Sequence, residues 1–232
     1  MNMKHKKTSE IKLSKRLFEI SKLVEGSIVA DVGCDHGLLS AYLAIKKNVF
    51  VYACDFRIKP LQKAVKNAEK FKAKNNIKFF LTDGLFKVPS NFDCVVVAGL
   101  GGREIQKIIF AHNFKVSDDV KIILQPQSFL FELRKNVYEK GFEIQDEIVV
   151  LEKGKFYNIL VLKYKEIFKE ISLKEAVLGK VLKRKGQYVL KYLEFLKNKV
   201  ENVLNGLRCS KSLNLKEIEK YEEIREVLLK LN

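Results

Sequence analysis

The sequence predicts an α/β fold in which a doubly wound parallel sheet with one reversed strand precedes an antiparallel pair of helices. Three observations predict this fold. Short β-branched or aromatic runs alternate with helical patterns from Ser27 to Lys140. Two longer strand-like runs, at 142–152 and 155–164, are joined by the turn E-K-G-K, which is typical of a hairpin. Beyond Tyr164 the apolar spacing becomes that of packed helices.

Five strand–helix units are predicted in the first part of the chain. Each predicted strand is a short apolar run that stops at a polar or glycine-containing turn. These strands cover 28–30, 48–54, 77–81, 92–98 and 120–124. The predicted helices between them cover 38–46, 58–72, a stretch after 102, and 129–140. The repeated strand–helix order favours parallel strands joined by crossovers, and the final hairpin supplies the reversed strand.

The segment after residue 164 is predicted to be a helical hairpin. Ser172 is placed to cap a helix that runs to about Asn205. Apolar residues recur along it at alternating intervals of four and three, as in a coiled-coil seam: Val189, Leu193, Leu196, Val200, Val203 and Leu207. Residues 211–214 are expected to form the turn into a second helix. We therefore expect two parts, residues 1–164 and 165–232. The periodicity leaves open whether the coiled coil forms within one chain or dimerises two.

The most informative segment is S-I-V-A-D-V-G-C-D-H-G-L-L, which starts at Ser27. Asp31 ends a strand, and a turn through Gly33 and Gly37 leads into a helix. Glycine lets backbone approach a ligand closely, and the helix N-terminus points N–H groups into the same space. A dinucleotide fingerprint requires a different glycine spacing, and Asp31 and Asp35 would repel a pyrophosphate. The acids suit a ligand that carries a cation, such as S-adenosylmethionine (AdoMet). The alternative is a turn used only for packing.

Composition limits the class of protein. The chain has 232 residues, of which 47% are hydrophobic, enough for one substantial domain with a smaller appendage. No apolar run approaches the ~20 residues that a membrane span requires, and the N-terminus lacks the apolar segment of a secretory signal. The four cysteines form no C-x-x-C pair, which argues against a zinc site or a disulfide framework. We expect a cytoplasmic protein with reduced thiols, no metal and no membrane partner.

The net charge of +16 is concentrated at the two ends of the chain. Residues 1–16 carry +5 and residues 163–232 carry +7, whereas the long middle segment carries only +4. Basic ends around a nearly neutral middle favour a polyanionic substrate such as a nucleic acid. The alternative is a lysine-rich surface that is merely solvated.

The glycine turn resembles the first motif of class I methyltransferases, although Asp35 replaces that motif's middle glycine. The fourth strand ends in A-G-L-G-G rather than in the D/N-P-P-Y/F of amino-group methyltransferases. Together with L-S-K-R-L, G-C-D-H, T-D-G-L and I-L-Q-P-Q, this pattern resembles the bacterial tRNA adenine-22 N1-methyltransferase family over essentially the whole chain. The resemblance implies a Rossmann-like sheet, AdoMet as cofactor and tRNA as substrate. It leaves the oligomeric state open, and we expect a monomer.

The resemblance also implies roles for individual residues. Asp55 would accept hydrogen bonds from ribose hydroxyls, and Asp83 with Gly84 would hold the adenine of the cofactor. The full set expected to bind AdoMet is Asp31, Gly33, Cys34, Asp35, His36, Gly37, Leu38, Asp55, Asp83, Gly84, Ala98 and Gly99. The set expected to bind tRNA is Lys12, Lys15, Arg16, Leu100, Gly101, Gly102, Gln125, Pro126, Lys183, Arg184 and Lys185.

The absent D/N-P-P-Y/F motif fits methylation of a ring nitrogen. N1 of neutral adenine has an in-plane lone pair, so it can attack the methyl group directly if it is held in line. The product is cationic, and Asp31, Asp35 and Asp83 are the candidates for stabilising it or for binding AdoMet. Gln125 is expected to read a base edge, and His36 to pack or donate a hydrogen bond rather than act as a base. The alternatives are a small-molecule methyltransferase and a non-catalytic RNA-binding module.

Overall fold

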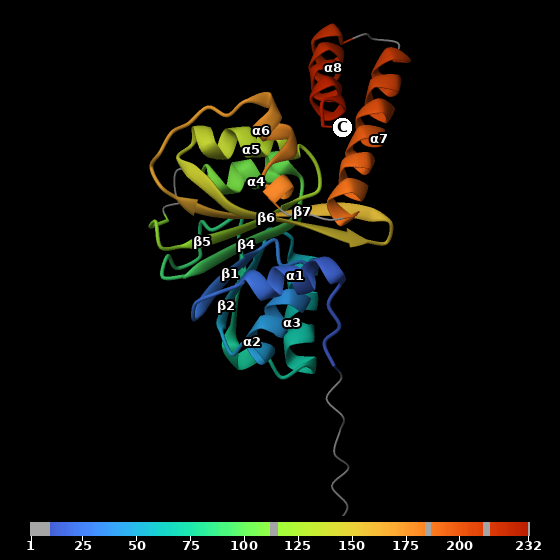
Figure 1. The fold of residues 1–232 in the computed structure, drawn as a ribbon. Coiled ribbons are helices and arrows are strands. Elements are labelled where there is room, and N and C mark those ends of the chain that lie inside the picture. The colour runs from blue at the N-terminus through green and yellow to red at the C-terminus, as the bar shows by residue number, and fades with distance from the viewer. Residues whose placement is uncertain (1–9, 112–115, 184–186, 211–213, 232) are drawn as a thin grey trace, which may run out of the picture.

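A computed structural model of the protein describes residues 10–111, 116–183, 187–210 and 214–231. Its centre is a seven-stranded sheet in the order β3-β2-β1-β4-β5-β7-β6 (Figure 1). Strands β1 to β5 are parallel, and β7 pairs antiparallel with both β5 and β6. The strands are β1 (Ile28–Val32), β2 (Phe50–Asp55), β3 (Ile77–Leu81), β4 (Cys94–Leu100), β5 (Lys121–Pro126), β6 (Phe142–Glu152) and β7 (Lys155–Tyr164). The predicted doubly wound sheet with one reversed strand is confirmed.

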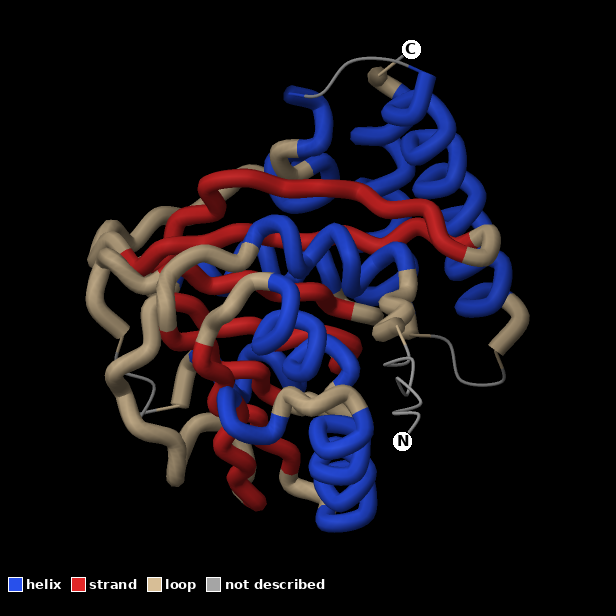
Figure 2. Tube along the Cα trace, turned by 90° about the horizontal axis from the view of Figure 1, so that it is seen from below, coloured by secondary structure: helices blue, strands red, loops and turns tan. Residues whose placement is uncertain are grey.

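Helices cover both faces of the sheet (Figures 1 and 2). One face carries α1, α2 and α3, whose apolar side chains pack on inward-facing residues of β1, β2 and β4. The other face carries α4 and α5. Each helix therefore buries one stripe, while the parallel strands are buried on both sides. These helices are α1 (Lys15–Leu23), α2 (Leu38–Lys46), α3 (Ile58–Lys70), α4 (Gly102–Ile109) and α5 (Leu130–Glu139).

The C-terminal helices form a third apolar cluster at the β6–β7 end of the sheet. They are α6 (Leu173–Leu178), α7 (Gln187–Arg208) and α8 (Leu215–Leu229). Ser172 caps α6 with a capping box completed by Glu175, as the sequence predicts. Helices α7 and α8 pack against each other within one chain, and the base of α7 rests on the β6–β7 hairpin (Figure 1). The predicted helical hairpin is therefore present.

One predicted helix is broken in the structure. The stretch expected to run from Ser172 to Asn205 ends first at Gly179, whose φ of +57° no ordinary helical residue adopts. Side chains of Arg134 and Glu147 fill the space where a Cβ of residue 179 would lie. The seam of α7 also differs, since Tyr192 and Leu204 are buried where Leu193 and Val203 were expected.

Of the helices in the described part of the chain, none combines the length and the apolar composition that crossing a bilayer requires.

Candidate active site

The candidate site lies where the strand order reverses, between the carboxyl ends of β1 and β4. In open α/β sheets this crevice is where ligands bind, because the following loops diverge to opposite faces. A cavity of about 260 Å³ opens there. Its lining includes the predicted residues Asp31, Gly33, Cys34, Asp35, His36, Leu38, Ala98, Gly99 and Leu100. Residues far apart in the sequence are thus brought together as the sheet topology requires.

The glycine turn after β1 has the backbone that the motif predicts. Gly33 and Gly37 have φ of +72° and +65°, in the left-handed region that favours glycine. A Cβ on Gly37 would lie 2.7 Å from the Cβ of Ala64 on α3, so α2 and α3 can approach only because residue 37 has no side chain. Asp35 also has a positive φ of 49°, which aspartate tolerates better than most residues.

Asp31 is buried at the end of β1 and accepts a hydrogen bond of 2.5 Å from the hydroxyl of Ser40 on α2. Burial raises its pKa to about 6, against the opposing effect of the Ser40 hydrogen bond. The carboxylate is therefore charged at neutral pH, although burial makes the charged form energetically unfavourable. A cationic ligand beside it would offset this desolvation cost.

Asp55 ends β2, and its carboxylate organises the loops on both sides. One oxygen accepts a hydrogen bond from the backbone N–H of Asp35 at 3.1 Å. The other accepts from the backbone N–H and the side chain of Arg57, at 2.9 and 3.3 Å. Asp55 is buried and is not among the residues that line the cavity. A carboxylate offers about four lone-pair sites, so part of its acceptor capacity is unused. The half-exposed Arg57 covers this position and also pairs with Asp35 at 3.6 Å.

A second cavity of about 480 Å³ adjoins the first, and Leu100 lines both. Asp83 and Gly84, expected to hold an adenine, lie in its wall. Phe56 and Phe86 contribute exposed aromatic rings beside them, which the sequence reasoning did not single out. The arrangement suits a ligand with a charged end near Asp31, hydroxyls near Asp55 and a flat ring between apolar walls.

The thiol of Cys34 is buried in the glycine turn, and burial raises its pKa above the ordinary range of thiols. A thiol held protonated is a poor nucleophile, so Cys34 serves as a small apolar wall of the cavity. His36 is nearly half exposed at the mouth, with Nδ1 3.8 Å from the carboxylate of Asp35.

The loops after β4 and β5 are tied together across the site. The N–H of Gln127 donates to the carbonyl of Leu100 at 2.9 Å, and the N–H of Gly102 donates to the carbonyl of Ser128 at 3.0 Å. A Cβ on Gly102 would lie 2.5 Å from that carbonyl. The first and last glycines of A-G-L-G-G therefore have different roles. Gly99 lines the cavity, whereas Gly102 packs against the neighbouring loop.

Arg16 reaches this site from α1, which lies against β6. Its Nη1 donates to Oε1 of Gln125 at 2.7 Å, and its guanidinium lies 5.1 Å from the ring centre of Tyr157 on β7. Its Nε is buried and has no hydrogen-bond partner among the described residues. A buried donor without a partner, on the wall of the first cavity, fits an anionic ligand group such as a carboxylate.

The structure corrects the expectation for Gln125. Its side chain is fully buried, its oxygen is bound by Arg16, and its nitrogen donates to the carbonyl of Pro126 at 2.8 Å. It therefore supports Arg16 and does not face a base. The next glutamine, Gln127, lines the cavity instead. No feature of the sequence shows which of Gln125 and Gln127 faces the cavity.

The remaining predicted substrate residues are more scattered. Lys12 is exposed in the segment before α1, Lys15 is exposed at the first residue of α1, and Lys183 is exposed at the end of a short 3₁₀ turn. Arg184 and Lys185 lie outside the described residues. The sequence reasoning also missed Arg57 and Leu39 in the first cavity.

This fold and site define a class I methyltransferase: the sheet order, the acid before the glycine turn and the acid after β2 are its features. Comparison with known proteins agrees. The sequence profile of the methyltransferase-domain family matches residues 13–160.

Three relatives narrow the assignment. A Mycoplasma genitalium protein, provisionally described as a tRNA methyltransferase, is 35% identical over 165 residues, which are 68% of this chain and 73% of that one. The tRNA (adenine(22)-N(1))-methyltransferase of Bacillus subtilis is 31% identical over 156 residues, 66% of each chain. The structure of M. capricolum TrmK with S-adenosyl-homocysteine is 26% identical, covers 94% of this chain and 96% of that one, and has a TM-score of 0.77. The chain belongs to the bacterial tRNA (adenine(22)-N1)-methyltransferase family.

Proposed function

We propose that the protein transfers a methyl group from AdoMet to N1 of adenosine 22 in tRNA. The observation that carries this proposal is the pair of adjoining cavities at the β1–β4 crevice, whose acids and glycine turn match what AdoMet requires. The named relatives support the choice of tRNA, and so does the concentration of positive charge at the chain ends.

Each part of AdoMet has a suitable partner in the site. The buried carboxylate of Asp31 complements the ligand's positive charge, and Asp55 is placed to accept from ribose hydroxyls. The unpartnered Nε of Arg16 suits the methionine carboxylate, so we assign Arg16 to the cofactor as well as to the substrate side. Phe56 and Asp83 border the space for the adenine. When bound, AdoMet supplies an electrophilic methyl group.

The chain's own contribution to chemistry is positioning. N1 of neutral adenine carries its lone pair in the ring plane, so no side chain has to remove a proton before attack, and we propose that transfer is direct and in line. Gly99 and Leu100 border the cofactor cavity on the side where the base would enter. Asp35, exposed at the mouth beside Arg57, is the carboxylate best placed to stabilise the cationic product.

Residues 165–232 form the proposed tRNA-binding appendage. Its helices bury their apolar stripes in one cluster within the chain, which supports a monomer. Residues 163–232 carry a net charge of +7, which suits contact with phosphates.

Mapping the position of the methyl group tests the proposal. Unmodified tRNA should acquire 1-methyladenosine when incubated with the protein and AdoMet, as shown by mass spectrometry of nucleosides before any alkaline treatment. Methyl on the exocyclic N6 would contradict the argument from A-G-L-G-G. Calorimetry should show AdoMet bound and NADH ignored.

A further inference from the structure

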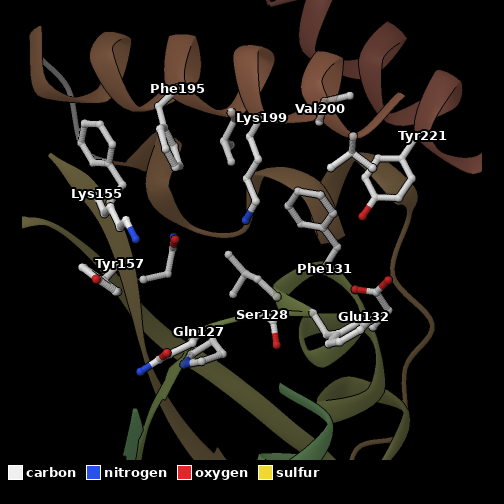
Figure 3. Close-up of a pocket in the computed structure, with 17 residues that line it drawn as sticks. Gln127, Ser128, Phe131, Glu132, Lys155, Tyr157, Phe195, Lys199, Val200 and Tyr221 are labelled. Carbon is white, nitrogen blue, oxygen red and sulfur yellow. The ribbon is translucent and has the colours of Figure 1, made fainter. Parts of the chain in front are cut away.

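A large cleft outside the cofactor cavities lies between α7 and the loop that follows β5. It has a volume of about 550 Å³, within the range of ligand-binding pockets. Its floor is the loop between β5 and α5, one wall is the start of β7, and its roof is α7 with one residue of α8 (Figure 3). We call it the aromatic cleft and define it by Phe131, Tyr157, Phe195, Tyr221, Lys155 and Lys199.

Aromatic side chains dominate its walls. Phe195 comes down from α7, tilted against Phe156 with ring centres 5.1 Å apart. Phe131 and Tyr221 lie at the opposite end of the cleft, next to each other (Figure 3). None of these three rings is fully buried. Partly exposed rings on facing walls are the arrangement on which a nucleobase stacks.

Two ammonium groups enter the same space. Lys199 extends from α7 into the cleft, and Lys155 enters it from β7 (Figure 3). Neither ammonium group forms an ion pair or a hydrogen bond with another described residue. The acid in the wall, Glu132, is already paired with Lys220 of α8. The free charge inside the cleft is therefore positive, which complements a phosphate.

The cleft adjoins the cofactor site. Gln127 lines both the aromatic cleft and the first cofactor cavity. Tyr157 lines the cleft, while its ring is covered by Arg16, which lines that cavity. The two spaces are therefore neighbours, as two adjacent units of a chain-like ligand require.

We propose that the aromatic cleft binds an unpaired nucleotide of the tRNA, its base between the rings and its phosphate on Lys155 and Lys199. This site rests on the proposed function and adds a second nucleotide subsite beside the methylated adenosine. Rings and cations together select a nucleotide over a purely apolar ligand, which would leave both ammonium groups unpaired. The subsite would hold the tRNA in register for transfer.

Two substitutions distinguish the contribution of base stacking to tRNA binding from that of the phosphate contact. Phe195→Leu removes a ring without changing charge and should weaken tRNA binding about 10-fold, with an unchanged salt slope. Lys199→Gln should weaken binding and also flatten the slope of log affinity against log salt by about 0.7 to 0.9. Both should raise the KM for tRNA and leave the dissociation constant for AdoMet unchanged.

Two variants outside the cleft provide matched controls. Leu190→Ala alters an exposed residue of α7 that does not line the cleft, and Lys70→Gln removes an exposed charge from α3 on the other face of the sheet. Each should change tRNA affinity less than threefold. If Phe195→Leu behaves like Leu190→Ala, the subsite does not exist. Because Phe195 also packs on Phe156, thermal unfolding must show that the variant folds.

Ultraviolet cross-linking of tRNA to the full chain gives a readout that does not depend on these variants. Peptides that contain Phe131, Phe195 or Tyr221 should carry cross-linked nucleotides, and Lys199→Gln should reduce their yield. Cross-links confined to other peptides would overturn the proposal even if methylation is normal. A wild-type protein that methylates no tRNA would instead overturn the proposed function.

Discussion

Asp31 is the residue whose protonation state matters most for the cofactor. Its pKa is raised to about 6 by burial, so falling pH neutralises it while the ligand's sulfonium stays charged. We expect AdoMet affinity to fall about 10-fold between pH 7.5 and pH 5, because only about a tenth of Asp31 is then charged. Calorimetry across this range measures the effect.

Two variants check that assignment. Asp31→Asn should bind AdoMet weakly, with an affinity that does not change between pH 7.5 and pH 5. His36→Gln should retain the pH dependence of the wild type. Without ligand, the stability of the fold changes with pH in the opposite direction to AdoMet affinity. Because the pKa of Asp31 is higher in the folded than in the unfolded protein, protonation at low pH stabilises the fold. From pH 7.5 to pH 5, the free energy of unfolding of the wild type should therefore rise by about 1 kcal/mol relative to that of Asp31→Asn. A wild type with pH-independent affinity would contradict this account of the site.

Gly37 tests the close packing behind the glycine turn. Gly37→Ala adds a Cβ 2.7 Å from that of Ala64, in addition to the strain of a φ of +65°. Gly154→Ala is a matched control, since its φ is +76° and no described atom lies within 4 Å of the added Cβ. We expect the control to lose about 1 kcal/mol of unfolding free energy, and Gly37→Ala to lose about 2 kcal/mol more, in urea titrations. Equal losses would show that the turn has room.

At the scale of elements, a buried polar network joins the C-terminal helices to the sheet. Arg134 of α5 pairs with Glu147 of β6, and both are fully buried. Asn158 of β7 donates to Glu147 at 2.7 Å and accepts from the hydroxyl of Tyr192 on α7 at 3.0 Å. Arg134 also donates to the carbonyls of Ala176 and Val177 in α6. Five elements, α5, α6, α7, β6 and β7, are thus fixed around one ion pair.

Breaking this ion pair from one side should be costly. Glu147→Leu leaves a buried guanidinium without its counter-ion and should lower the free energy of unfolding by about 3–5 kcal/mol. The double variant Arg134→Met with Glu147→Leu should lose less than Glu147→Leu alone, because no uncompensated charge remains. Chemical denaturation of both variants measures the difference, and additive losses would refute the coupling.

The network also shows what the sequence could not predict. Periodicity placed strands β3, β6 and β7 and helix α2 with their observed bounds, because local patterns of buried residues determine them. It missed the break at Gly179 because the cause is a tertiary contact with Arg134 and Glu147. It likewise could not show that Gln125 is buried under Arg16, since these residues are 109 positions apart.

At the scale of the whole molecule, the positive charge is concentrated at the two ends of the chain. The sequence predicts that Lys183, Arg184 and Lys185 contact tRNA phosphates; Lys183 is exposed where the chain enters α7. Reversal of all three to Glu should weaken tRNA binding and flatten its salt slope by about 0.7 to 0.9 per lost contact. AdoMet affinity should not change. If methylation survives while sedimentation shows loss of a dimer, the helical hairpin serves dimerisation instead.

Methylation of N1 of adenosine 22 in tRNA by this chain can be tested with two transcripts that differ at one base. The protein is incubated with methyl-labelled AdoMet and two unmodified transcripts of one tRNA, with adenine or guanine at position 22. We predict label in the adenine transcript alone, released as 1-methyladenosine. Equal labelling of both transcripts, or label in neither while AdoMet binds, would contradict the account.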